Sequence, residues 1–115
     1  MLKTAVIGAS SYIGKHLIKM YRKKFPDCIG TFFKNKSSAN KYFNLHNSSI
    51  KKLKLLETGH ESVIITAAQP NIGFCEKNKK LSYDLNVKAP LRIIKDLSKT
   101  SIKIIFLSSD YVFQG

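Results

Sequence analysis

A turn bounded by two glycines near the amino terminus has residue types and spacing suited to binding phosphate. It spans Gly8 to Gly14, follows a short apolar run and leads into an amphipathic segment. A helix that starts after such a turn offers free backbone N–H groups, and its dipole favours an anion such as a pyrophosphate. Gly8 permits the tight turn, and Gly14 allows the helix to pack closely on the strand. We therefore expect a dinucleotide site at this turn.

An ordinary strand-to-helix turn is the alternative interpretation of the same residues. The rest of the chain favours the dinucleotide site, because apolar runs and amphipathic segments alternate as in a parallel α/β sheet. The expected strands are Leu2–Ile7, Cys28–Phe33, Tyr42–Leu45, Ser62–Ala67 and Ile102–Leu107. Right-handed crossovers would arrange them as a Rossmann-like doubly wound sheet of order 3-2-1-4-5. A flavodoxin-like order is the topological alternative.

Three helical segments are expected between these strands. The second is capped by Ser48 or Ser49 and stops at Gly59, and the third runs from about Lys79 to Leu97 and is bent or divided at Pro90. Each should turn apolar residues toward the sheet. These residues are Ile13, Leu17, Met20 and Tyr21 in the first segment, Ile50, Leu53, Leu55 and Leu56 in the second, and Leu81, Leu85, Val87, Leu91, Ile94 and Leu97 in the third.

Length and composition predict one globular domain over residues 1–115. The chain is 43% hydrophobic and 10% aromatic, which excludes a disordered chain. It has no apolar run of membrane-spanning length and no signal-peptide pattern, so a cytoplasmic location and no membrane contact are expected. Cys28 and Cys75 have no metal-ligand spacing, and the interpretation is two reduced thiols, buried or nearly so, and no metal site.

The formal net charge of +13 would suit an anionic partner. The excess consists almost entirely of lysines spread along the whole chain, with arginine only at positions 22 and 92. Proteins that recognise nucleic-acid phosphates usually use arginine guanidinium groups, or clusters of basic residues beside aromatic residues that stack on bases. The charge is therefore interpreted as a lysine-rich compositional bias, and nucleic acid is not an expected partner.

The residue types after the second expected strand bear on the choice of dinucleotide. An NAD site carries an acidic residue about 20 positions after the turn, where it holds the ribose 2′-hydroxyl. Here that position is Lys34, and no acidic residue lies between Cys28 and Tyr42. A cation suits the 2′-phosphate of NADP, so the sequence favours NADP(H) over NAD(H).

Several motifs together resemble the dTDP-4-dehydrorhamnose reductase family of extended short-chain dehydrogenases/reductases and related sugar-nucleotide-binding proteins, including regulatory subunits. The most specific is Ser108-Ser109-Asp110-Tyr111-Val112-Phe113-Gln114-Gly115. The others are the glycine turn, Val63–Ala68, Cys75-Glu76 and Tyr83–Val87. The resemblance covers the whole chain but only the amino-terminal part of the family's length.

The resemblance implies that the dinucleotide is contacted by Gly8, Ser10, Ser11, Tyr12, Ile13 and Gly14. It also implies roles for residues beyond the turn. Ser11 stands where the family usually has a glycine, so its side chain would crowd the phosphate. Asn44 stands near the adenine, where relatives often have an aspartate. Ala67, Ala68 and Gln69 would border the nicotinamide ribose, and Asn86 would support the floor of the site. Ser109, next to Ser108, would be the hydroxyl of a Ser/Thr-Tyr-Lys triad.

Family chemistry is hydride transfer to a sugar 4-keto carbon, with a tyrosine of a Tyr-x-x-x-Lys pair supplying the proton. None of the five tyrosines has a lysine at the fourth following position. We therefore expect a dinucleotide-binding part of a reductase, inactive alone, that ends after the fifth strand. A sugar nucleotide would bind only if the full-length enzyme exists. The alternative is a non-catalytic regulatory or interaction module that self-associates through the uncovered sheet edge.

Overall fold

Parallel strands and helices alternate along the described part of the chain. The computed structural model describes residues 1–32, 41–43, 49–66 and 88–107. Its elements are β1 (Thr4–Ile7), α1 (Tyr12–Lys24), β2 (Thr31–Phe32), β3 (Lys41–Tyr42), the 3₁₀ helix η1 (Ile50–Leu53), β4 (Ser62–Ile65), α4 (Ala89–Leu97) and β5 (Lys103–Phe106). No helix in these ranges is long and apolar enough to cross a membrane.

The strand pairing is parallel throughout the described residues. β1 pairs with β4, and β4 pairs with β5, while β2 pairs with β3. An isolated bridge between Val6 and Gly30 connects the two ladders, and Val6 N–H donates to the carbonyl of Ile29 at 2.9 Å. The parallel α/β sheet is confirmed, and the flavodoxin-like order is wrong because β1 pairs directly with β4. The order 3-2-1-4-5 as one continuous sheet stays a prediction.

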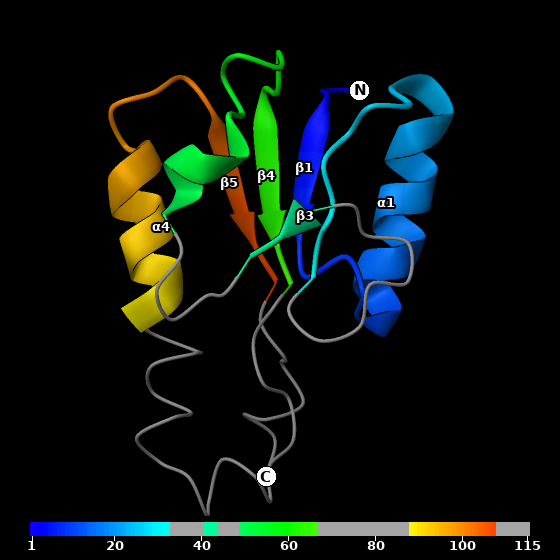
Figure 1. Ribbon diagram of the computed structural model, residues 1–115, viewed down its shortest axis with the longest axis horizontal. Helices are drawn as coiled ribbons and strands as arrows, with labels where there is room; N and C mark the ends of the chain where they lie inside the picture. Colours follow the sequence, from blue (N-terminus) through cyan, green and yellow to red (C-terminus); the bar gives the residue numbers. More distant parts are fainter. Residues whose placement is uncertain (33–40, 44–48, 67–87, 108–115) are drawn as a thin grey trace, which may run out of the picture.

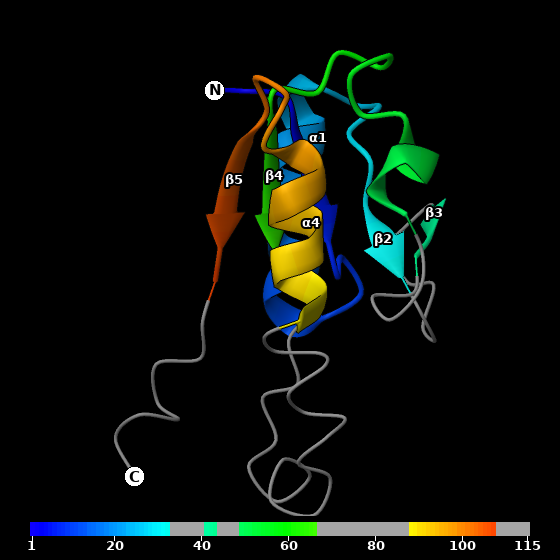
Figure 2. The same cartoon turned by 90° about the vertical axis from the view of Figure 1, so that its left-hand side faces the viewer.

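The two long helices lie on opposite faces of the sheet (Figure 1 and Figure 2). Alternate residues of β1 pack on opposite faces of the sheet: Val6 packs toward α1, whereas Ala5 and Ile7 pack toward α4. The core on the α4 side is the larger and consists of Ala5, Ile7, Ile29, Phe43, Ile50, Leu53, Leu55, Val63, Ile65, Ile93, Leu97 and Ile102. Because both faces of β1 and β4 are covered, these strands are apolar at almost every position.

The inward face of α1 agrees with the predicted one in part, since Leu17 and Tyr21 are partly buried against the core on the α1 side. Ile18 is fully buried, while Ile13 and Met20 are exposed. The reason is Gly30 at the start of β2: a Cβ there would lie 3.1 Å from Cγ1 of Ile18, so α1 packs on the sheet through this contact. Ile13 and Met20 are each roughly 140–160° around the helix from Ile18 and cannot share its face.

The inward face of α4 is also narrower than predicted. Ile93 and Leu97 are buried, which confirms Leu97, but Leu91 is 57% exposed and Ile94 is exposed. Ile93 and Leu97 are one helical turn apart, and Leu91 lies about 160° from Ile93. Pro90 lies in the first turn of α4, where its missing N–H costs no helical hydrogen bond. Residues 79–87 of the expected helix lie outside the described residues.

The expected helix from Ile50 to Leu56 is a short 3₁₀ helix that ends at Leu53. Lys54 follows in the left-handed conformation with φ 52°, and Leu55 then enters the core. A continuous α-helix would place Leu55 about 140° from Ile50, so it could not bury both residues on one face. Ser49 caps the helix as predicted, and its hydroxyl accepts from the N–H of Lys51 at 3.3 Å.

Cys28 is fully buried as predicted, and burial raises the pKa of its thiol. Cys75 lies outside the described residues.

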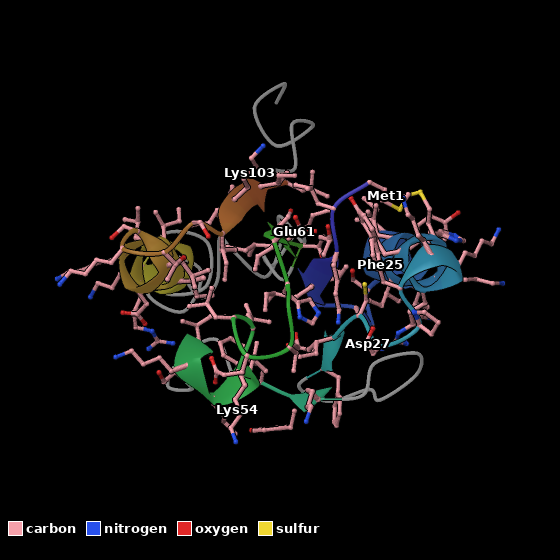
Figure 3. The ribbon with its side chains drawn as sticks, turned by 90° about the horizontal axis from the view of Figure 1, so that it is seen from above. Met1, Phe25, Asp27, Lys54, Glu61 and Lys103 are labelled. Carbon is pink, nitrogen blue, oxygen red and sulfur yellow. The ribbon has the colours of Figure 1, made fainter. Side chains whose placement is uncertain are left out.

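Polar contacts tie the segments at the amino ends of the strands. Figure 3 looks onto this end, where Asp27 and Glu61 mark the segments that lead into β2 and β4. Lys3 forms an ion pair with Asp27, and its Nζ donates to the carbonyl of Thr58 at 2.6 Å. The hydrogen bond from Lys3 lowers the pKa of Asp27.

His60 completes this network from a buried position. The N–H of Ile29 donates to Nε2 of His60 at 3.1 Å, so Nε2 carries no proton. Nδ1 lies 2.8 Å from the hydroxyl oxygen of Thr58, which fits a neutral ring with its proton on Nδ1. Burial lowers the pKa of His60, and the nearby charge of Lys3 lowers it further. The neutral ring thus joins the start of β2 to the segment before β4.

We expect the free energy of unfolding to fall as the pH drops below about 6.5. The unfolded histidine, whose ordinary pKa is 6.5, then binds a proton that the folded ring excludes. The contribution of His60 to the free energy of unfolding is therefore fully present above pH 6.5. It is lost as the pH falls toward the lowered pKa of the folded ring. Asp27 acts in a more acidic window, below its ordinary value of 3.8. Urea unfolding between about pH 5 and 8 measures the effect.

The matched variants are His60→Gln and His16→Gln. Glutamine can accept the Ile29 N–H without titrating, so His60→Gln should flatten the pH dependence. His16 is exposed on α1, and its replacement should leave the dependence unchanged. An unchanged slope in His60→Gln would contradict the assignment.

Candidate phosphate-binding turn

The turn between β1 and α1 has the geometry that the sequence predicts. Gly8 adopts φ 93°, a conformation that favours glycine. Ser11 is the N-cap of α1, and its hydroxyl oxygen accepts from the N–H of Gly14 at 3.0 Å. The same hydroxyl donates to the carbonyl of Gly8 at 2.8 Å. The Ser11 side chain is thus engaged inside the turn, and its effect on a bound phosphate stays a prediction.

Hydroxyl groups from outside the turn also hold Gly8. Thr31 Oγ1 accepts from the N–H of Gly8 at 2.9 Å, and the Thr31 carbonyl accepts from the N–H of Ala9 at 2.9 Å. Thr66, directly after β4, has its Oγ1 3.1 Å from the carbonyl oxygen of Gly8. The strands on both sides of β1 therefore fix the turn.

Gly14 allows α1 to lie directly against this turn. A Cβ on Gly14 would lie 2.1 Å from the carbonyl oxygen of Gly8 and 2.9 Å from Cα of Ala9. Both are backbone atoms and cannot rotate away. The predicted role of Gly14, close packing of helix and strand, is confirmed by this contact.

Tyr12 and Ile13 are the first two residues of α1, where a helix has no intrahelical acceptor for its backbone N–H groups. Tyr12 is 79% exposed and Ile13 is 55% exposed. In the described part of the chain, no group accepts a hydrogen bond from the N–H of either residue. The first turn contains no acidic residue, and the last carries Arg22, Lys23 and Lys24. An anion at the start of α1 would meet two unpaired donors and the positive end of the helix dipole.

The predicted site residues fall into two sets. Those of the glycine turn are described by the structure, and those after the later strands lie outside the described residues. Gly8, Ser10, Ser11, Tyr12, Ile13 and Gly14 form one continuous turn at the carboxyl end of β1. The residues outside the described ranges are Lys34, Asn44, Ala67, Ala68, Gln69, Asn86, Ser108 and Ser109.

Sequence reasoning missed Thr31 and Thr66 as site residues. Thr66 is a single polar residue near the carboxyl end of an apolar run, and ligands of open α/β sheets bind at that edge, whereas Thr31 lies within the run Cys28–Phe33. This signal was present in the sequence, although it does not reveal the partner of either hydroxyl. No cluster of three potential metal ligands occurs among the described residues.

Replacing Gly14 with alanine should destabilise the protein strongly. The new Cβ would collide with the backbone of Gly8, and relieving such overpacking costs on the order of 3 kcal/mol. Gly59→Ala is the matched control: a Cβ there meets nothing within 4 Å, and only its φ of 77° is unfavourable, at a cost of roughly 1–2 kcal/mol. Urea unfolding compares the two. Equal losses of stability would contradict the assigned role of Gly14.

Comparison with known proteins identifies the family. The family model described as the RmlD substrate binding domain matches residues 2–115. The β subunit of methionine adenosyltransferase 2 from Xenopus tropicalis is 23% identical over 113 residues, which cover 98% of this chain and 34% of that protein.

Solved structures agree on the fold. A hypothetical dTDP-4-dehydrorhamnose reductase from Sulfolobus tokodaii aligns with a TM-score of 0.81 at 21% identity, over 95% of this chain and 40% of that one. A partial-consensus L-threonine 3-dehydrogenase aligns with a TM-score of 0.75 at 20% identity, over 91% and 35%. The chain thus spans about two fifths or less of these relatives. The predicted Rossmann-like fold is confirmed, and the chain belongs to the RmlD substrate binding domain family.

Proposed function

We propose that this chain binds NADP(H), with the pyrophosphate against the start of α1, as the dinucleotide-binding part of a sugar-nucleotide reductase. The observation that carries the proposal is the two unpaired amides of Tyr12 and Ile13 above a turn that Gly8 and Gly14 make possible. The residues fit the group, since the turn offers N–H donors, a helix N-terminus and no acidic side chain. The similarity to a reductase over 95% of this chain supports the proposal.

The preference for NADP(H) depends on the segment after β2. β2 ends at Phe32, and Lys34 follows it by two positions. An extra phosphate on the adenosine ribose would meet a cation there instead of the carboxylate that suits NAD. In this proposal Asn44 lies near the adenine, while Ala67, Ala68 and Gln69 border the nicotinamide ribose.

The proposed reaction of a complete enzyme is reduction of a 4-keto sugar nucleotide. When bound, the nicotinamide supplies the hydride. Ser109, beside Ser108, would hydrogen-bond the keto oxygen, and Asn86 would support the floor of the site. Because no Tyr-x-x-x-Lys pair occurs in the sequence, these 115 residues alone have no proton donor of that kind and are proposed to be inactive. A cytoplasmic location stays a prediction.

Titration with NADPH and NADH tests the binding proposal. We expect the wild-type protein to bind NADPH more tightly, and Lys34→Ala to weaken NADPH binding about fivefold with little effect on NADH. Lys23→Ala, in the last turn of α1, is the control and should change neither affinity. Lack of NADPH binding at millimolar concentration would refute the proposal. Steady-state NADPH oxidation with a 4-keto sugar nucleotide would refute the proposed inactivity.

β5 favours the second candidate function, a non-catalytic interaction module. Within the described residues β5 is the outer strand of its sheet. It exposes Ile105 (44%) and Phe106 (39%), and Leu107 directly after it is also exposed. A run of this kind is typical of a strand buried on both faces. We therefore propose that the chain by itself self-associates through β5.

Sedimentation velocity at increasing protein concentration tests self-association. We expect dimers to increase with concentration and also with salt, because salt screens the repulsion between chains of net charge +13. Ile105→Lys should shift the protein to monomer, whereas Met20→Lys, at an exposed position on α1, should not. A wild-type protein that stays monomeric under all these conditions would rule out the β5 interface.

A further inference from the structure

Three side-chain hydroxyls from three parts of the fold hold the peptide groups on both sides of Gly8. Thr31 of β2 accepts from its N–H, and Ser11 at the start of α1 and Thr66 after β4 lie within hydrogen-bond distance of its carbonyl oxygen. We infer that Thr31 and Thr66 are positioning residues that keep the phosphate-binding turn in its ligand-ready shape. This inference rests on the proposed dinucleotide site.

Thr66 connects the end of β4 to the turn through several contacts. Its Oγ1 lies 2.9 Å from the carbonyl oxygen of Ile7 and 3.1 Å from that of Gly8, so its single proton serves one or the other. Its N–H donates to the carbonyl of Ile7 at 2.8 Å, and its Oγ1 lies 3.4 Å from Oγ of Ser11. Thr66 therefore touches the last residue of β1, the first residue of the turn and the N-cap.

Thr31 holds the turn from the opposite side. It is almost fully buried, and it accepts from two consecutive amides, those of Gly8 through Oγ1 and of Ala9 through its carbonyl. These amides are thereby committed to the protein. The amides left for a ligand among these residues are those of Ser10, Tyr12 and Ile13, whose directions depend on the turn that Thr31 and Thr66 fix.

The fixed conformation of the Gly8 peptide matters for dinucleotide affinity because Ser11 links this peptide to the start of α1. The Ser11 hydroxyl contacts both the carbonyl of Gly8 and the N–H of Gly14. If the Gly8 peptide rotates, the cap is lost and the first amides of α1 spread over several directions. A ligand must then supply the ordering free energy when it binds, and its affinity falls. A preorganised turn avoids this cost.

The experiment compares Thr66→Val and Thr31→Val, which remove a hydroxyl at nearly constant volume, with Thr66→Ser and Thr31→Ser, which keep it. Thr4→Val is the matched control: Thr4 is buried at the amino end of β1, away from the turn, and its hydroxyl donates to the carbonyl of Leu2 at 2.8 Å. NADPH dissociation constants and urea unfolding are measured for all five variants.

We expect each valine variant at Thr31 and Thr66 to bind NADPH about fivefold more weakly, the scale of one hydrogen bond. The serine variants should restore binding, and Thr4→Val should lose stability without losing affinity. Equal NADPH affinity in the wild-type protein and in both valine variants would overturn the inference, as would a loss in Thr4→Val as large as theirs.

A ligand-free measurement separates this inference from the proposed function. Amide hydrogen exchange at Gly8 and Gly14 should be faster in Thr66→Val and Thr31→Val than in the wild-type protein and in Thr4→Val. If the wild-type protein does not bind NADPH but exchange follows this pattern, the proposed function fails and the positioning role holds. Unchanged exchange in both valine variants overturns the positioning role whether or not NADPH binds.

Discussion

A Cβ on Gly14 would lie 2.1 Å from the carbonyl oxygen of Gly8, and this contact decides where α1 begins relative to β1. Gly30 does the same for the neighbouring strand, since a Cβ there would lie 2.8 Å from Cβ of Ala9 and 3.1 Å from Ile18. With both glycines in place, α1 lies directly on β1 and on the start of β2. Its first amides therefore open at the carboxyl edge of the sheet, where a ligand of this fold binds.

The fold predictions were more successful for strands than for the inward faces of helices. Strand positions could be read from the sequence because buried parallel strands are continuous apolar runs, and β4 and β5 fall within the expected ranges. The inward faces of helices were less predictable. Apolar residues occur at several helical spacings in α1, and the close approach of Ile18 to Gly30 favours the face that Ile18 shares with Leu17 and Tyr21. That choice depends on residues distant in sequence, which periodicity cannot report.

The candidate site also has a part that the sequence predicts, which is local, and a part that it does not, which depends on residues distant in sequence. The glycine turn is local, so its residues and spacing identify it, and its conformation follows from Gly8 and Ser11. The hydroxyl contacts of Thr31 and Thr66 join residues 23 and 58 positions from Gly8, and no local pattern predicts such pairs. Ser11 illustrates the limit, because the sequence has a serine in place of a glycine but does not show that its hydroxyl bonds both Gly8 and Gly14.

The two ends of β1 are held by different chemistry, and this separates folding from ligand affinity. The amino end depends on the Lys3–Asp27 ion pair and on the neutral ring of His60, and both Asp27 and His60 titrate with a lowered pKa. The hydroxyls of Thr31, Ser11 and Thr66 at the carboxyl end do not. Mild acid should therefore reduce the folded fraction through His60 while the folded molecules keep the same phosphate-binding turn. A ligand that binds only the folded state would then offset part of that loss by mass action.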